Sequence, residues 1–210
     1  MGKMRTPLLK ALIVLILICF QSGLLKGNDS TTYSISLNYY FDISDTYGGG
    51  ELFSGEFTIS KAWYGGKISF GHFQSQYAFI FKVPYEEIGQ TLEINIPEMS
   101  IMKIGSISGF IRPVQKKWFT TDIIFGAVLG GAKSLYLDEI YYEYNPAEDR
   151  FTYLYTEYQS VKKTHFGYEV GFDVSFYFSK KIGLQLKARI QDLSNGGTFF
   201  FVGTGLSFRL

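Results

Sequence analysis

The chain has 210 residues, of which 46% are hydrophobic, 18% aromatic and 19% charged, and its formal net charge is +1. So many aromatic residues exclude an intrinsically disordered chain, and a single cysteine excludes a disulfide-stabilised scaffold. The near-neutral charge gives no reason to expect nucleic acid as a partner.

The first 23 residues have the pattern of a secretory signal peptide. Lys3, Arg5 and Lys10 form a basic start, and residues 11–20 are all apolar, a run too short to cross a bilayer as a helix. We therefore predict that residues 1–23 are removed on export through the inner membrane, together with the one cysteine. Residues 24–32 are expected to form a short N-terminal segment.

Alternation of apolar and polar residues predicts β-strands over the rest of the chain. The alternation is regular in the first strand and the last three, and weaker in the four between them. In the third strand the apolar positions change from even to odd numbers, which predicts a bulge near Gly71 and His72. Eight strands are predicted, at residues 33–43, 51–63, 67–82, 98–112, 118–130, 166–178, 182–191 and 198–210.

The connections between these strands differ in length in a regular way. Short turns at 64–66, 113–117 and 179–181 fall at one end of the sheet, and the two longest connections, 83–97 and 131–164, fall at the other. Transmembrane barrels have this asymmetry, with short periplasmic turns and longer external loops. The pattern predicts an all-β fold, an eight-stranded antiparallel up-and-down transmembrane β-barrel. The prolines after the signal peptide are expected between strands: Pro84, Pro97, Pro113 and Pro146.

The polar faces of the strands favour a narrow barrel lumen over a solvated surface. They contain mostly glycine, serine and a few opposed charges, and an eight-stranded barrel has room inside for side chains alone. A secreted soluble barrel that binds an apolar ligand stays open as an alternative.

The turn at residues 179–181 predicts a register in the lumen. It places Phe178 opposite Ile182, and therefore Asp173 opposite Lys187. On the next strand Gly203 and Gly205 would leave room for Lys187 and Gln185. Exchanging Asp173 and Lys187 in a double variant is then expected to restore folding that either single variant loses. The predicted lumen ion-pair cluster consists of Glu169, Asp173, Lys187 and Arg189.

The long connection is rich in tyrosine on both sides of a predicted turn at residues 145–149. Two interpretations stay open: an external aromatic hairpin used in adhesion or in pairing with another protein, or an aromatic girdle at the membrane interface. The residues concerned are Tyr136, Tyr141, Tyr142, Tyr144, Phe151, Tyr153, Tyr155 and Tyr158.

With its signal peptide, eight alternating strands and terminal segment, the chain resembles small bacterial outer-membrane β-barrels of the OmpA-transmembrane-domain or porin-like type. The resemblance covers residues 33–210. It implies a location in the outer membrane, contact with outer-membrane lipid and recognition by the barrel-assembly machinery. It also implies a C-terminal assembly signal formed by Phe200, Val202, Leu206, Phe208 and Leu210.

Some small outer-membrane barrels are enzymes that modify lipid A or phospholipid with serine, histidine and an acid. Residues 189–195 resemble the His-x-Ser-Asn segment of lipid A deacylases, but Asp192 stands where the histidine belongs, and Ser194 is expected in a hairpin turn. The two histidines, His72 and His165, show no metal-site spacing. We therefore expect no catalytic residues, metal or cofactor, with a lipid-modifying enzyme as the alternative.

The function expected from the sequence is a structural or surface-interaction role, with an external protein or glycan as the candidate ligand. Because side chains would fill so narrow a lumen, little or no pore activity is expected.

Overall fold

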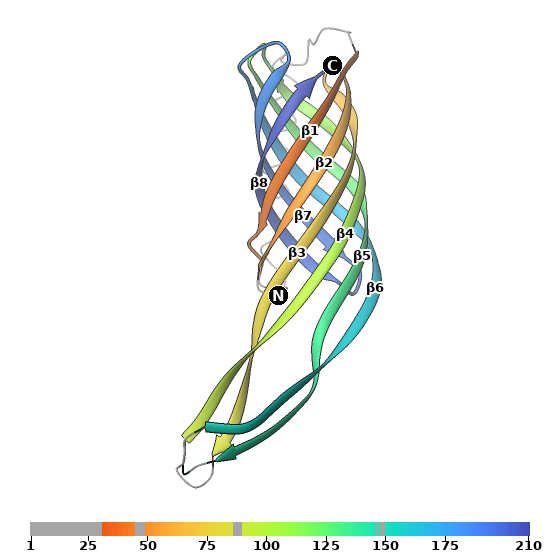
Figure 1. The fold of residues 1–210 in the computed structure, drawn as a ribbon. Coiled ribbons are helices and arrows are strands. Elements are labelled where there is room, and N and C mark those ends of the chain that lie inside the picture. The colour runs from red at the N-terminus through yellow and green to blue at the C-terminus, as the bar shows by residue number, and fades with distance from the viewer. Residues whose placement is uncertain (1–30, 45–48, 86–89, 146, 148–149) are drawn as a thin grey trace, which may run out of the picture.

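Eight antiparallel strands form one closed barrel, in which each strand pairs with its neighbours in chain order and β8 pairs with β1 (Figure 1). This computed structural model describes residues 31–210 apart from 45–48, 86–89, 146 and 148–149, so the predicted signal peptide lies outside the described residues. The predicted fold is confirmed. The strands are β1 (Thr31–Asp42), β2 (Gly50–Lys61), β3 (Tyr64–Tyr85), β4 (Gln90–Gln115), β5 (Phe119–Asn145), β6 (Arg150–Tyr177), β7 (Ile182–Leu193) and β8 (Gly197–Arg209).

Strands β3 to β6 continue well beyond the barrel, at the end opposite the short turns (Figure 1). The last described pair between β4 and β5 is Met99 with Leu135, and past it the strands continue as two separate hairpins. We call residues 77–98 the β3–β4 arm and residues 136–159 the β5–β6 arm. By the usual asymmetry of transmembrane barrels, the arms mark the external end.

Residues 83–97 and 131–164 were predicted to be loops, and this prediction was wrong. Most of both segments is paired strand, because β3 pairs with β4 as far as Tyr85 and Gln90, and β5 pairs with β6 as far as Asn145 and Arg150. Alternation of apolar and polar residues arises when one face of a strand is in an apolar environment and the other in a polar one. Where a strand leaves the membrane both faces meet water, so the alternation fades although the pairing continues.

The turn between β2 and β3 lies earlier than predicted, at Ala62 and Trp63, because Lys61 pairs with Tyr64. Ala62 adopts a left-handed conformation there. Gly65 belongs to β3 instead, at a close approach of side chains and backbone. A Cβ at Gly65 would lie 2.2 Å from the carbonyl oxygen of Ile59 and 2.5 Å from the ring of Phe110.

Three of the predicted inter-strand prolines lie within strands. Pro84 and Pro97 lie in the β3–β4 hairpin, past the last described pairs with β2 and β5. One edge of each strand is unpaired at that point, so a residue without an N–H need not break a ladder. Pro113 lies in β4 at a shift of register between Ile111 and Val114. Pro146 lies outside the described residues.

The predicted bulge near Gly71 and His72 was wrong. β3 pairs with β2 in unbroken register from Tyr64 to Gln74, and with β4 over its whole length. The phase of apolar residues changes because they lie on both faces of the strand: Phe70 is 71% exposed on the outside, whereas Phe73 is fully buried in the lumen.

The outer surface of the barrel has a continuous apolar belt. Along β6 and the residue that follows it, alternate positions from Phe166 to Phe178 face outward and all are apolar or aromatic. At a rise of about 3.3 Å per residue and a tilt near 45°, this stretch spans roughly 30 Å, close to the thickness of a bilayer's hydrocarbon core. Such a belt fits a barrel surrounded by lipid and does not fit the soluble alternative. No helix among the described residues is long and apolar enough to span a membrane.

Candidate functional site

Asp173 on β6 lies at the centre of a buried network of ion pairs in the lumen. One of its oxygens lies 2.6 Å from the Lys67 ammonium of β3, and Arg189 of β7 binds both oxygens through two guanidinium nitrogens. Lys187, also on β7, lies 3.6 Å away. Asp173 and Lys187 are both almost completely buried. A single carboxylate therefore connects strands on opposite sides of the barrel.

Two further carboxylates complete the network. Glu56 of β2 lies 2.8 Å from the Lys187 ammonium and 3.4 Å from that of Lys67. Asp122 of β5 lies 3.3 Å from Lys67 and accepts two hydrogen bonds from Arg112 of β4, at 2.7 and 3.2 Å. Buried charges are tolerated when each has an oppositely charged partner, and every member of this network lies within 4 Å of at least one.

Three of the four residues of the predicted lumen cluster meet in this network: Asp173, Lys187 and Arg189. The register pairs Asp173 with Lys187, and Glu169 with Gln191, so that Glu169 lies diagonal to Arg189. Glu169 nevertheless forms different contacts, accepting hydrogen bonds from Ser106 at 2.9 Å and from Gln191 at 3.1 Å. Four members were not predicted from the sequence, where each stands apart from other charges on its own strand: Glu56, Lys67, Arg112 and Asp122.

This geometry changes the expectation for the exchange of Asp173 and Lys187. A lysine at position 173 would lie beside Lys67 and Arg189, and an aspartate at position 187 would lie beside Glu56. The network is shared among several groups, so the double exchange creates like-charge contacts and is not expected to restore folding.

Gly203 and Gly205 pair with Lys187 and Gln185 in register, but β1 occupies the space beside them. A Cβ at Gly203 would lie 2.1 Å from the carbonyl oxygen of Tyr39, and one at Gly205 would lie 2.2 Å from the side chain of Asn38. The glycines therefore accommodate β1 rather than the two β7 side chains.

Above the charged network, toward the external end, the lumen contains a cluster of packed apolar side chains. Phe199 and Phe201 of β8 stack with their ring centroids 5.6 Å apart, and Phe73 contacts both rings edge-on at 5.4 and 5.7 Å. Both rings are almost completely buried. The buried apolar cluster consists of Tyr40, Leu52, Phe73, Met102, Ile104, Val128, Leu193, Phe199 and Phe201.

The β5–β6 arm has two different faces. Its register places Glu139 opposite Glu157, Tyr141 opposite Tyr155 and Glu143 opposite Tyr153, so these six side chains share one face. We call them the acidic aromatic face. All six are exposed, and the rings of Tyr141 and Tyr155 lie 6.2 Å apart. On the other face, the ring of Tyr142 packs against that of Phe81 of the β3–β4 arm, with 6.1 Å between the ring centroids.

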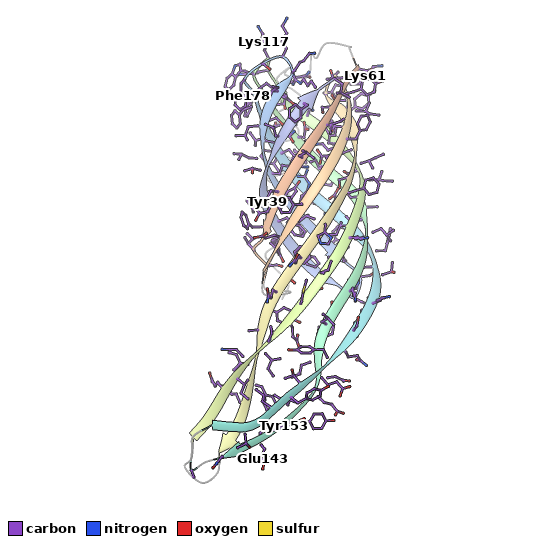
Figure 2. All side chains as sticks on the ribbon, in the orientation of Figure 1. Tyr39, Lys61, Lys117, Glu143, Tyr153 and Phe178 are labelled. Atoms are coloured by element: carbon purple, nitrogen blue, oxygen red, sulfur yellow. The ribbon has the colours of Figure 1, made fainter. Side chains whose placement is uncertain are left out.

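The aromatic residues of the β5–β6 arm lie away from the apolar belt. Figure 2 shows Tyr153 and Glu143 near the far end of the arm, whereas Tyr39 lies on the barrel and Phe178 at the opposite end. The hydroxyl of Tyr141 donates a hydrogen bond to Glu139, and this carboxylate raises the pKa of the Tyr141 phenol. Tyr136 and Tyr158 lie at the base of the arm, and the side chains of Tyr144 and Phe151 lie outside the described ones.

The residues of the predicted C-terminal assembly signal all lie on the outside of β8 or at its end. Phe200, Val202, Leu206 and Phe208 are 37–48% exposed, and Leu210 is 73% exposed. They belong to the apolar belt.

The two histidines have different surroundings. His72 is exposed on the outside of β3, whereas His165 is buried in β6 near the external end of the barrel. The Nδ1 of His165 lies 2.8 Å from the carbonyl oxygen of Ser194, so this nitrogen is the donor. The Ser194 hydroxyl accepts a hydrogen bond from the Phe166 amide at 3.2 Å, and Asp192 accepts one from Tyr168 at 2.9 Å. These contacts join β6 to the β7–β8 turn.

No group of three or more potential metal ligands occurs among the described residues. No protein-family signature matches the sequence, and none of the curated proteins matches it.

Several solved structures share the fold. Neisserial surface protein A is 9% identical with a TM-score of 0.55, over 86% of this chain and 99% of that protein. A major outer membrane protein from Thermus thermophilus is 11% identical with a TM-score of 0.53, over 86% of this chain and 100% of its own. Ail, the attachment invasion locus protein of Yersinia pestis, in complex with the heparin analogue sucrose octasulfate, is 12% identical with a TM-score of 0.50, over 86% and 97%.

At this level of identity the likeness concerns the fold. The chain has the fold of the small bacterial outer-membrane β-barrels, and the resemblance expected from its sequence is confirmed.

Proposed function

We propose that the protein is a non-enzymatic outer-membrane barrel that presents its two arms outside the cell as a binding surface. The observation that carries this proposal is the extension of β3 to β6 beyond the belt, with tyrosine rings exposed at its end. Tyr141, Tyr153 and Tyr155 are 47%, 52% and 50% exposed. Tyrosine is enriched at protein interfaces because its ring contributes apolar area and its hydroxyl a hydrogen bond.

The filled lumen supports a binding role over transport. Ion pairs cross the middle of the barrel, and packed rings occupy its external end. Eight-stranded barrels have lumens just wide enough for such side chains.

The chemistry of the arm favours a protein as the ligand. Among the described residues of the acidic aromatic face, three are glutamates and three are tyrosines. Carboxylates and the faces of aromatic rings both attract cations, so the complementary surface is a protein surface with lysine or arginine side chains. The sulfated analogue bound to Ail is an anion, and this face would repel such a ligand.

An adhesion assay with arm variants tests the proposal. Cells of a non-adherent Gram-negative strain that express the protein are expected to bind surfaces coated with extracellular-matrix protein. The triple variant Tyr141→Ser, Tyr153→Ser, Tyr155→Ser should reduce the affinity of the purified protein for the same coating roughly 100-fold, at about 1 kcal/mol for each buried ring. Replacing residues 138–157 by an Asn-Gly turn should abolish binding, because it removes the whole acidic aromatic face. The shortened hairpin should still form, since Leu137 and Tyr158 are paired and a two-residue turn can join them.

Two controls keep the adhesion result interpretable. Each variant must show heat-modifiable gel mobility, which reports a folded barrel. Ser194→Ala should bind as the wild type does, and expression of either protein should leave lipid A acylation unchanged. Unaltered adhesion without the arm would refute the binding role, and altered lipid A acylation lost in Ser194→Ala would favour the enzymatic alternative.

A further inference from the structure

A shallow groove lies on the outer surface of the barrel, across β3, β4 and β5, near the external edge of the apolar belt. Its lining includes Phe70, His72, Lys103, Gly105, Leu129 and Gly131. We propose that this groove binds a phosphorylated lipid of the outer leaflet, with an acyl chain over the glycines and a phosphate group at Lys103. This proposal is independent of the proposed binding role of the arms.

The groove results from small residues placed between large ones. In register, Gly105 lies between Phe70 and Leu129, which are 71% and 56% exposed. Two residues further toward the external end on β5, Gly131 pairs with Lys103, and a Cβ at Gly131 would have no atom within 4 Å. Because these glycines have no side chains, an apolar channel that could hold an acyl chain lies on a surface that faces lipid.

Basic residues lie where this channel reaches the edge of the belt. His72 and Lys103 pair across β3 and β4, in the row directly beyond Phe70 and Gly105. In the next row outward, Lys133 of β5 pairs with Lys162 of β6, and both are exposed. An anionic phosphate at the headgroup level would meet Lys103 first and the other two lysines beyond it.

The outward-facing acidic residue in these rows, among the described residues, lies away from the lysines, at the other side of the groove. Glu51 of β2 occupies the same row as Lys133 and Lys162, but it contacts the Tyr39 hydroxyl of β1, across β3 from the lysines. Over β4 to β6, the described residues at this edge of the belt therefore carry positive charge, which complements a phosphate.

A second groove on the barrel provides a matched comparison. It crosses β1, β2, β7 and β8, and its lining includes Leu37, Gly55, Leu184 and Leu206 without a charged residue. A Cβ at Gly55 would also have no atom within 4 Å. A leucine at Gly55 or at Gly131 should therefore be accommodated without steric conflict, and each fills one groove.

Native mass spectrometry of the full-length mature protein released from lipid nanodiscs tests the proposal. The probe is bisphosphorylated lipid A, compared with its dephosphorylated form and with inorganic phosphate. We expect a bound lipid on the wild type that Gly131→Leu reduces at least tenfold, that Lys103→Gln reduces roughly fivefold, and that Gly55→Leu leaves unchanged. Heat-modifiable mobility confirms that each variant is folded.

Each alternative outcome overturns a stated part of the proposal. Equal binding of dephosphorylated lipid would exclude recognition of phosphate by Lys103. Displacement by millimolar inorganic phosphate alone would exclude the acyl channel. Equal loss in Gly55→Leu and Gly131→Leu would mean that lipid adheres to the belt without a site.

Discussion

Substitution of Asp173 by alanine is expected to lower the free energy of unfolding by about 3–5 kcal/mol. The substitution leaves Lys67, Lys187 and Arg189 buried without their shared carboxylate. Arg189 then keeps only Glu56 as a partner, 3.6 Å away, and a buried cation without a close partner cannot recover the hydration that it lost on folding. The measurement is reversible urea unfolding in lipid vesicles, followed by the fluorescence of Trp63 and Trp118.

The exposed pair Lys82–Glu93 is the matched control for Asp173. Its atoms lie 3.0 Å apart, but its side chains are 64% and 55% exposed. Because water screens such a pair, Glu93→Ala should cost less than about 1 kcal/mol. If Asp173→Ala unfolds at the same urea concentration as Glu93→Ala, the lumen network does not stabilise the barrel.

The second large effect is expected in the apolar cluster, where Phe73→Ala should cost about 3–5 kcal/mol. Phe73 is fully buried against Phe199 and Phe201, so its removal leaves a cavity in addition to the lost burial. The same unfolding measurement applies.

Phe70→Ala serves as the control for this cavity, three residues away on the same strand. Phe70 faces outward, where lipid can fill the vacated space, so the substitution should cost only the transfer part, about 2 kcal/mol. Equal losses in the two variants would contradict the placement of Phe73 in the lumen.

The sequence was sufficient to predict what depends on neighbours along the chain. The turn of residues 179–181 set the pairing of β6 with β7, so the position of Asp173 opposite Lys187 could be derived by counting. A contact across the lumen cannot be counted in this way. Lys67 and Asp173 are 106 residues apart and meet because the closed barrel brings β3 close to β6.

The errors came from applying the rule for membrane strands where its physical basis is absent. Apolar residues were expected to face lipid, but the external half of this lumen holds an apolar cluster of its own, so the inward position of Phe73 suggested a bulge. Alternation was expected to mark strands, but the arms lie in water on both faces, so their strands were interpreted as loops. Both signals describe the surroundings of a strand rather than the strand itself.

The central claim is that side chains seal the lumen while the arms lie outside the membrane. Ion conductance of the purified, folded protein in planar bilayers tests the seal most directly, with an open porin as the positive control. We predict no steady conductance above the baseline of the bilayer, because ion pairs and packed rings occupy successive levels of the lumen. Large, steady conductance steps from the wild-type protein would contradict this account.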